Sequence, residues 1–353
     1  MQIFLVGGAV RDQLLQRPVS ERDWVVVGGT AEQLLSQGFR AVGRDFPVFL
    51  HPQTGEEYAL ARTERKIAAG YHGFAIQAGE SVSLEQDLLR RDLTINAIAQ
   101  DASGQLIDPY RGLQDLQQRW LRHISPAFAE DPVRILRVAR FAARYAHLGF
   151  KIADETMDLM RQMVVNGEVE HLVPERVWAE IEKALTEINP EIFFQSLRNC
   201  GALEKILPEL NQLFGIPQPA HYHPEIDCGI HSLFVLQQAS ILSLKTSVRF
   251  AALVHDLGKG KTPIAILPHH YGHEMRGLAI FSQLANRLKM PNHYRQLAEL
   301  VIRYHTHIHR AFELKASTLI DLLIELKAFK PPYQINDFLL VCEADAKGRT
   351  GFE

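Results

Sequence analysis

The sequence predicts an α+β protein in which an N-terminal sheet domain is followed by two helical domains. Over residues 1–123, short apolar runs bounded by glycine and polar residues alternate with helical patterns. From about residue 119 onward, the apolar residues recur at the spacing of amphipathic helices instead. Eleven of the 16 histidines then fall within residues 221–309, which indicates a chemically distinct last domain. These observations predict domains at 1–123, 124–226 and 227–353.

The bulk composition is that of an ordinary globular protein, and it excludes several classes. The chain of 353 residues has a net charge of −3, so any contact with RNA must come from local basic surfaces. The sequence contains no apolar run of about eighteen residues, so no membrane span is expected. The N-terminus enters an apolar run without a basic leader, and the three cysteines are scattered, which favours a reduced, cytoplasmic location.

The first motif is a glycine pair between a predicted strand and a predicted helix. Residues 3–6 form an apolar run typical of a buried strand, Gly7 and Gly8 end it, and residues 9–16 have a helical pattern. Free backbone N–H groups at such a turn can bind an anion, and glycine allows a phosphate to approach closely. Arg11 lies near the start of the helix and can donate to the same phosphate. A glycine pair alone is usually only a tight turn.

An acidic pair lies just ahead of the second apolar run. Glu21 and Asp23 precede residues 24–27, which have the pattern of a strand. Because residues i and i+2 of a strand share a face, both carboxylates are expected on the same side of the sheet. Carboxylates beside a phosphate site can hold Mg²⁺ ions that also bind nucleotide phosphates. A lone acidic pair is usually a solvated strand end, but both motifs within one short span favour a catalytic site.

The rest of the first domain is predicted to complete the sheet. Two short strands are expected at 39–42 and 47–51, and residues 57–61 are expected to pair back on them after a turn. Glu57 is a candidate third carboxylate, although a charge at a strand end is the more common explanation. Residues 62–80, which are rich in arginine, lysine and glycine, are predicted to form a basic loop that contacts RNA or is merely solvated.

A pair of arginines follows the next predicted helix. Ser83 caps that helix, which runs to Leu89 with acidic residues in its first turn. Arg90 and Arg91 leave its C-terminal end, where a guanidinium can bind a triphosphate. The alternative is that both arginines only interact with the helix dipole, which is common. Of these two explanations, we predict nucleotide binding for Arg91.

Four arginines form a stripe on a helix that begins at Asp131. At about 100° per residue, their side chains fall within about 120° of one another. No acidic residue occurs between Asp131 and Lys151, so salt bridges within the helix cannot neutralise the stripe. An anionic or planar group is therefore expected to lie against it. The stripe consists of Arg134, Arg137, Arg140 and Arg144.

The histidine-rich part contains candidate metal ligands. His255 and Asp256 are adjacent at the end of a predicted helix at 248–257, and His231 lies on the preceding helix. Histidine and carboxylate ligands together suit divalent transition metals. Further candidate ligands are His273 on a predicted loop, His305 on a helix and Asp345 near the C-terminus. No role is expected for His221, His223 and His269.

These motifs together resemble one protein family. Residues 5–12 (Leu-Val-Gly-Gly-Ala-Val-Arg-Asp), the acidic pair and residues 90–97 (Arg-Arg-Asp-Leu-Thr-Ile-Asn-Ala) are similar to motifs of the bacterial tRNA nucleotidyltransferases, the CCA-adding enzymes of the DNA polymerase β-like superfamily. The resemblance is greatest to the multifunctional form with an HD phosphohydrolase domain, and it extends over essentially the whole chain. One position differs, because the family usually has Asp-x-Asp where this chain has Glu21-x-Asp23.

The resemblance implies a polymerase β-like nucleotidyltransferase head, an all-α neck and body, and a helical HD domain. In the family, the segment that corresponds to residues 130–134 reads the incoming base. Asp131 and Arg134 are therefore expected to bind cytosine or adenine, which share an exocyclic amino group. Arg137 and Arg140 are expected to contact the nucleotide. The first HD metal would be held by His231, His255, Asp256 and Asp345, and a second by His273 and His305.

The predicted function is the addition of C, C and A to tRNA 3′ ends from CTP and ATP. Glu21 and Asp23 are expected to hold Mg²⁺. Gly8, Arg11 and Arg91 are expected to hold phosphates. The HD domain is predicted to hydrolyse phosphoesters, such as 2′,3′-cyclic phosphates and 2′-nucleotides, with Ni²⁺ or Mn²⁺. The enzyme is expected to be a monomer or a homodimer.

Three alternatives remain open. A bacterial poly(A) polymerase shares the first domain, but it would be expected to carry a strongly basic tail and not the histidine cluster. A stand-alone HD nucleotidase with a degenerate first domain would make no CTP-dependent product, and a non-catalytic RNA-binding scaffold would tolerate loss of every carboxylate. Since family members usually continue into a helical tail that grips tRNA, the end of the chain soon after Asp345 predicts a short or truncated tail.

Overall fold

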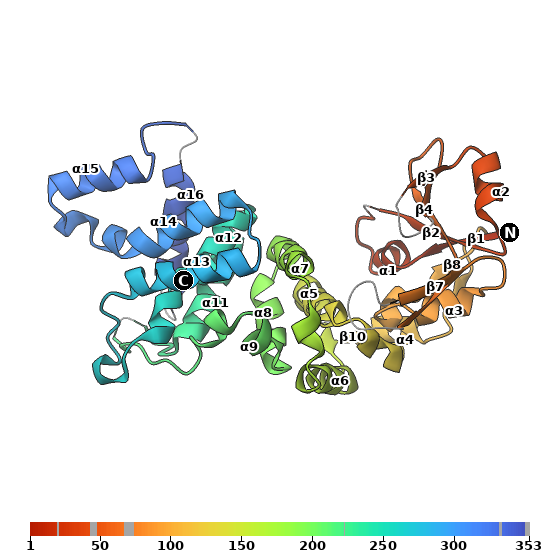
Figure 1. The fold of residues 1–353 in the computed structure, drawn as a ribbon, viewed down its shortest axis with the longest axis horizontal. Coiled ribbons are helices and arrows are strands. Elements are labelled where there is room, and N and C mark those ends of the chain that lie inside the picture. Colours follow the sequence, from red (N-terminus) through yellow and green to blue (C-terminus); the bar gives the residue numbers. More distant parts are fainter. Residues whose placement is uncertain (20, 43–47, 67–73, 222, 332–333, 350–353) are drawn as a thin grey trace. The chain divides into compact units, whose positions relative to one another are not determined.

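A computed structural model describes residues 1–19, 21–42, 48–66, 74–221, 223–331 and 334–349 of the chain (Figure 1). These residues form two compact units. The first consists of Met1–Arg134 with Leu148–Met163, and the second of Ile135–His147 with Val164–Glu353. The first unit contains a mixed sheet and the second is helical, which confirms the predicted α+β class. Residues 43–47, which include the connection between the strands predicted at 39–42 and 47–51, lie outside the described residues.

The first unit is built on a seven-stranded sheet with the strand order β3-β4-β5-β2-β1-β8-β9. Its strands are β1 Gln2–Val6, β2 Asp23–Val27, β3 Arg40–Val42, β4 Val48–Leu50, β5 Glu57–Leu60, β8 Ala99–Gln100 and β9 Leu106–Ile107. β2 and β5 are parallel, and the other neighbouring pairs are antiparallel. The central strands β1 and β2 are short continuous apolar runs, because strands with side chains packed on both faces need apolar residues in succession.

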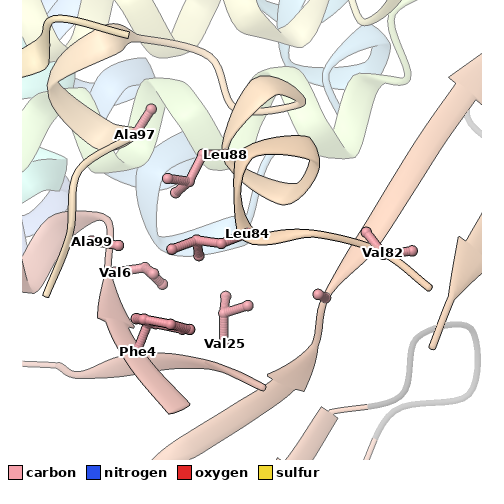
Figure 2. Packing of buried hydrophobic residues seen from close by; sticks show 9 residues of the cluster. Phe4, Val6, Val25, Val82, Leu84, Leu88, Ala97 and Ala99 are labelled. Carbon is pink, nitrogen blue, oxygen red and sulfur yellow. The ribbon is translucent and has the colours of Figure 1, made fainter. Parts of the chain in front are cut away.

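Apolar cores lie on both faces of this sheet. Four α-helices have all of their residues in the first unit: α1 Gly8–Leu14, α2 Ala31–Ser36, α3 Leu84–Leu89 and α4 Gly112–Gln118. Val25 and Val26 are adjacent on β2 and therefore point to opposite faces. Figure 2 shows Val25 in one core with Phe4 of β1 and Leu88 of α3. Val26 packs in the other core with Leu34 of α2.

Two parts of the first unit differ from the prediction. The basic segment that was predicted to be a loop contains a hairpin, β6 (Arg62–Lys66) and β7 (Phe74–Ala78), and the residues between these strands lie outside the described part. β6 has the sequence Arg-Thr-Glu-Arg-Lys, which contains no apolar alternation to reveal a strand. In the region predicted to be helical throughout, β10 (Trp120–Leu121) and β11 (Lys151–Ile152) form a parallel pair that is too short to show any periodicity.

The second unit consists of packed helices. From α5 onward the helices are α5 Val133–Tyr145, α6 Asp154–Val165, α7 Pro174–Thr186, α8 Pro190–Asn199, α9 Ala202–Ile206, α10 Pro208–Asn211, α11 Cys228–Leu242, α12 Thr246–Val254, α13 His273–Arg287, α14 Asn292–His309, α15 Ala316–Glu325 and α16 Gln334–Lys347. α5 and α6 each begin in the first unit. Helices α11, α12, α13, α14 and α16 pack against one another (Figure 1). The candidate metal ligands lie on these helices or directly after them.

A buried arginine ties this bundle to the helices that precede it within the second unit. Arg249 on α12 donates to the carbonyl oxygen of Leu185 on α7 at 2.7 Å and to that of Ser240 on α11 at 3.0 Å. These carbonyls lie in the last turns of their helices, where intrahelical donors are missing. None of the described helices has both the length and the apolar character needed to cross a bilayer.

Candidate functional site

The glycine pair lies at the end of β1, beside an acidic side chain and a guanidinium. Gly7 has a φ of +70°, and a Cβ at this position would lie 2.8 Å from Nη1 of Arg91. Only glycine therefore fits both the backbone and the close approach of the arginine. Gly8 follows as the first residue of α1. In the register of β1 with β2, Val6 is opposite Asp23, so the glycine turn and this carboxylate meet at one edge of the sheet.

Asp23 lies on the sheet face that α3 covers, since it is two residues before Val25 on the same strand. Burial raises the pKa of Asp23, the Arg91 guanidinium lowers it, and Glu21 raises it again, so that the net change is an increase. Glu57 is the partner of Asp23 in the parallel register of β2 with β5. Carboxylate oxygens are the ligands that a hard divalent cation prefers, so the chemistry of these side chains fits Mg²⁺.

Glu21 does not belong to strand β2, contrary to the prediction. β2 begins at Asp23, because β1 ends at Val6 and offers no partner further along. The argument that strand periodicity puts both carboxylates on one face is therefore wrong for Glu21, which is exposed ahead of the strand. The negative charge of Glu21 still contributes to the raised pKa of Asp23, after burial as the main cause.

A fully buried carboxylate holds the arginine pair. Asp87 Oδ1 accepts from Arg90 Nε at 3.0 Å and from Nη2 at 2.9 Å, while its Oδ2 accepts from Arg91 Nη2 at 3.3 Å. Burial by itself raises the pKa of Asp87, but the charges of Arg90 and Arg91 outweigh it, and the pKa lies below its usual value. Asp87 is thus ionised at neutral pH and orients Arg91 toward Gly7.

Arg11 is buried in a polar network of the first unit. Its Nε and Nη2 donate to the two carboxylate oxygens of Asp12 at 3.0 and 2.9 Å, and its Nη1 donates to Oδ1 of Asn96. Asn96 Nδ2 in turn donates to Asp92 at 2.8 Å. A Cβ on Gly8 would lie 3.4 Å from Arg11 Nη2, so the guanidinium borders the glycine turn while it is paired with Asp12. Its predicted contact with phosphate stays a prediction.

The two residues expected to read the base lie at the start of α5, in the first unit. Asp131 Oδ1 accepts from the backbone N–H of Val133 at 3.1 Å. Arg134 Nη1 donates to the carbonyl oxygen of Ala127 at 2.9 Å, and Nη2 donates to that of Arg90 at 2.6 Å. Arg134 is therefore hydrogen-bonded to the residue next to Arg91. The candidate that reads the base and the candidate that binds phosphate are thus both held by the segment around Arg90.

The remaining arginines of the stripe lie in the second unit. Arg140 is buried, and its Nε donates to Oε2 of Glu180 on α7 at 2.7 Å. The guanidinium carbon atoms of Arg137 and Arg140 lie 5.8 and 4.8 Å from the ring centre of Phe141. Glu180 therefore supplies an anionic partner for Arg140, whereas Phe141 belongs to the same helix as the arginines, so the expectation for the stripe as a whole stays a prediction. The sequence showed no neutralising acid, because Glu180 is distant along the chain.

The histidine-rich helices bring the first predicted set of metal ligands together. His231 on α11 places its Nε2 at 3.1 Å from Oδ1 of Asp345 on α16. His255, directly after α12, places its Nε2 at 3.7 Å from the same oxygen and at 3.1 Å from Oδ2 of Asp256. All four residues are buried.

The second predicted set shares Asp256 with the first. Oδ1 of Asp256 lies 3.3 Å from Nε2 of His273 and 3.5 Å from Nε2 of His305, and these two nitrogens are 3.4 Å apart. His273 is the first residue of α13 rather than a loop residue, so the prediction of a loop there was wrong. Its position in α13 fixes the direction of the His273 side chain. The Asp256 carboxylate lies between the two groups of candidate ligands.

The local hydrogen bonds prepare these atoms to bind a metal ion. Nδ1 of His255 and of His305 each lie 2.8 Å from a backbone carbonyl oxygen, which leaves Nε2 of each ring free to act as a ligand. Among the described residues, no hydrogen bond reaches His255 Nε2 or Asp256 Oδ1, although both atoms are buried. Burial raises the pKa of Asp256, but His255 and Lys259 outweigh it and hold the pKa well below its usual value. The donor set fits a divalent transition metal.

Two further side chains at this centre escaped the sequence analysis. His309 Nε2 lies 2.7 Å from Oδ2 of Asp345, and Lys259 Nζ lies 2.6 Å from Oδ2 of Asp256. Helical spacing could have pointed to His309, which is four residues after His305 on α14. Lys259 is three residues after Asp256 in the turn that follows the adjacent His-Asp pair.

Three family descriptions match successive parts of the chain. Residues 3–122 match the poly A polymerase head domain. Residues 149–214 match the probable RNA and SrmB-binding site of polymerase A, and residues 229–346 match the HD domain. The order is that of a nucleotidyltransferase head, a helical body and an HD module.

Curated relatives and solved structures extend over nearly the whole chain. The multifunctional CCA protein of Teredinibacter turnerae is 62% identical over 353 residues, which cover 100% of this chain and 86% of that protein. That of Thioalkalivibrio sulfidiphilus is also 62% identical, with the same coverage. A CCA-adding enzyme in an apo form has a TM-score of 0.66 at 21% identity, covering 97% of this chain and 75% of that one. A tRNA-processing enzyme with CTP has a TM-score of 0.57 at 25% identity, covering 97% and 84%. The chain therefore belongs to the family of multifunctional CCA proteins, CCA tRNA nucleotidyltransferases that also carry an HD domain.

Proposed function

We propose that the first unit catalyses the addition of C, C and A to the 3′ ends of tRNA from CTP and ATP, in tRNA maturation and repair. The observation that carries this proposal is the meeting of Asp23, the glycine turn and Arg91 at one edge of the sheet. The name of the 62% identical relatives and the CTP bound to a structural neighbour support the same substrates.

Glu21 and Asp23 are proposed to hold the Mg²⁺ ions of this reaction. When bound, Mg²⁺ stabilises the negative charge on the attacking ribose 3′ oxygen and on the leaving pyrophosphate. The pKa of Asp23 is raised mainly by burial and further by the charge of Glu21, and a bound cation would favour the ionised form of both carboxylates. Glu57 is a candidate third carboxylate because of its register with Asp23.

Arg91, Gly8 and Arg11 are proposed to hold the triphosphate. Asp87 fixes the Arg91 side chain, of which only 17% is exposed, before any nucleotide arrives. A guanidinium that is already oriented needs no reorganisation when charge develops on the phosphates. Gly8 would contribute its backbone N–H, and Arg11 the part of its guanidinium that borders Gly8.

Asp131 and Arg134 are proposed to select cytosine and adenine, with Arg137 and Arg140 contributing further nucleotide contacts. A carboxylate accepts from the exocyclic amino group that both bases carry, and a guanidinium donates to ring acceptors. Neither pattern suits guanine or uracil. The anchoring of Arg134 on two backbone carbonyls supports the proposal, because it fixes the direction of the guanidinium.

Replacing Asp131 by alanine is expected to relax the preference for CTP and ATP over UTP and GTP. The loss of one good base contact corresponds to about 1–3 kcal/mol of discrimination, or roughly 5- to 150-fold. Binding of the triphosphate should change little, since Arg91 is held independently by Asp87. Competition between labelled nucleotides on a tRNA that lacks its CCA end measures the ratio. An unchanged ratio would rule out the base-reading role.

The HD centre is proposed to hydrolyse phosphoesters, as a 2′,3′-cyclic phosphodiesterase, 2′-nucleotidase and phosphatase. His231, His255, Asp256 and Asp345 would hold a first Ni²⁺ or Mn²⁺ ion. His273 and His305, with Asp256, would hold a second. When bound, the metal supplies a nucleophilic hydroxide at neutral pH and polarises the phosphoryl group.

Binding of Mn²⁺ to the HD centre is expected to release about one proton at pH 7. Burial lowers the pKa of His231, but its hydrogen bonds to Asp345 and Glu225 outweigh burial and raise the pKa to about 9. The metal-free protein therefore carries a protonated His231 below that pH, whereas a ligand imidazole must be neutral. Affinity should rise with pH up to about 9. Calorimetry in two buffers of different ionisation enthalpy counts the protons, and a buffer-independent heat would contradict this expectation.

One experiment separates the proposed function from its alternatives. A tRNA lacking its terminal CCA is incubated with labelled CTP or labelled ATP. Incorporation of CTP first and of ATP only afterwards supports CCA addition. Use of ATP alone, with a growing tail, identifies a poly(A) polymerase. The absence of any nucleotide-dependent product leaves the HD centre as the only activity.

We further propose that the domains of the chain are divided after residues 123 and 226. A tRNA substrate and three buried free cysteines support a cytoplasmic location. Whether the enzyme acts as a monomer or as a homodimer is tested by light scattering at working concentration.

A further inference from the structure

The segment between the helical body and the HD bundle folds back on itself. Residues 215–228 fall between the parts of the chain that match the RNA-binding and HD families. Gln218 N–H donates to the carbonyl oxygen of Ile226 at 2.7 Å, and Gly215 N–H donates to a carboxylate oxygen of Asp227 at 2.6 Å. These bonds close the segment into a compact loop within the second unit.

The loop places a buried carboxylate behind a metal-ligand candidate. The Glu225 side chain is 2% exposed, and its Oε1 lies 3.0 Å from Nδ1 of His231. The other ring nitrogen of His231, Nε2, faces Asp345 at 3.1 Å. His223 Nδ1 lies 3.1 Å from the same Glu225 oxygen. The two nitrogens of His231 are thus assigned to different tasks, one toward the centre and one toward Glu225.

A second side chain of the loop extends this contact to Asp256. Gln218 Nε2 donates to Glu225 Oε1 at 3.3 Å, and Gln218 Oε1 accepts from Lys259 Nζ at 3.0 Å. Lys259 Nζ in turn lies 2.6 Å from Oδ2 of Asp256. Gln218 and Lys259 are both buried, at 2% and 7% exposure. A continuous buried chain of polar contacts therefore joins His231 to Asp256 behind the metal centre.

We propose that Glu225 and Gln218 are positioning residues of the HD metal centre, so that the loop before the HD match completes the site. The inference rests on the proposed HD function. A carboxylate behind a histidine ligand fixes its tautomer and ring direction and makes the other nitrogen a better ligand. Gln218 holds Glu225 and Lys259 at a fixed spacing, which keeps His231 and Asp256 in one arrangement.

The test measures metal affinity directly, with Mn²⁺ alone as the probe. Glu225→Gln keeps the size of the side chain and removes its charge, and Gln218→Met removes both hydrogen bonds at similar length. Each variant is expected to bind Mn²⁺ about 10- to 100-fold more weakly by calorimetry. Hydrolysis of a 2′,3′-cyclic nucleotide should recover when Mn²⁺ is raised. The thermal midpoint in EDTA and CCA addition should match those of the wild type.

Glu182→Gln is the matched control, because Glu182 accepts a hydrogen bond from the Tyr294 hydroxyl at 2.8 Å in the same unit and is in none of the described ligand groups; this variant should bind Mn²⁺ normally. Wild-type affinity in both loop variants would overturn the inference. So would a lowered midpoint in EDTA with unchanged affinity, which marks a purely structural role. If Glu225→Gln does not fold, the Mn²⁺ affinity of Gln218→Met alone tests the inference. If the wild type itself binds no Mn²⁺, the proposed HD function fails rather than this inference alone.

Discussion

Replacing Asp23 by alanine is expected to slow single-turnover addition of CMP to a tRNA lacking its CCA end by about 10²- to 10³-fold. Asp23 is the acidic side chain that the β1–β2 register places beside the glycine turn and within the field of Arg91. Its loss removes a ligand for the cation that stabilises both the attacking and the leaving oxygens. Rapid-quench measurement with enzyme in excess over labelled CTP isolates the chemical step.

A nearby carboxylate provides the control for this variant. Glu56 accepts a hydrogen bond from Trp24 Nε1 at 2.9 Å and lies one residue before β5, so Glu56→Gln should leave CMP addition unchanged. Phosphoester hydrolysis by the HD centre reports that Asp23→Ala is folded. Near-normal CMP addition by Asp23→Ala would remove Asp23 from the proposed metal site.

Replacing His255 by alanine is expected to abolish metal-dependent phosphoester hydrolysis while CCA addition persists. His255 Nε2 is buried without a hydrogen bond among the described residues and lies close to both Asp256 and Asp345. Loss of a direct ligand should weaken Mn²⁺ binding beyond the roughly 10- to 100-fold typical of supporting residues. Hydrolysis of 2′,3′-cyclic AMP and CMP incorporation are measured on the same preparation.

The exposed residue His269 provides the control variant for His255→Ala. His269 stacks on Tyr271 at 5.6 Å and makes no contact with the described ligand groups in the metal clusters, so His269→Ala should retain hydrolysis. Turnover that survives His255→Ala would count against the metal centre. Loss of both activities in His255→Ala would point to unfolding of the chain instead, and a thermal melt in EDTA distinguishes the two results.

Local sequence patterns predicted the parts of the site that depend on neighbouring residues. The apolar runs marked β1 and β2, and the glycine pair marked the turn between β1 and α1. The adjacent His255 and Asp256 marked the cluster of buried histidine and aspartate side chains that could hold a metal ion. Such features are visible because side-chain periodicity and backbone conformation are set by residues only a few positions apart.

Contacts between distant segments could not be predicted in the same way. The carboxylate that pairs with Arg140 comes from α7, and the carboxylate behind His231 comes from a loop with no regular periodicity. Glu21 lies ahead of β2 because the pairing of β1 with β2 ends at Val6 and Asp23. Each of these depends on which elements pack together.

The sequence by itself determined the α+β class, the order of the domains and the family, because these follow from local patterns and motifs. Only the tertiary structure decided that Asp256 faces both His255 and His273, that Asp87 orients Arg91, and which buried charges are neutralised. The physical reason is that a buried charge needs a partner within a few ångströms in space, and the chain can supply that partner from any position.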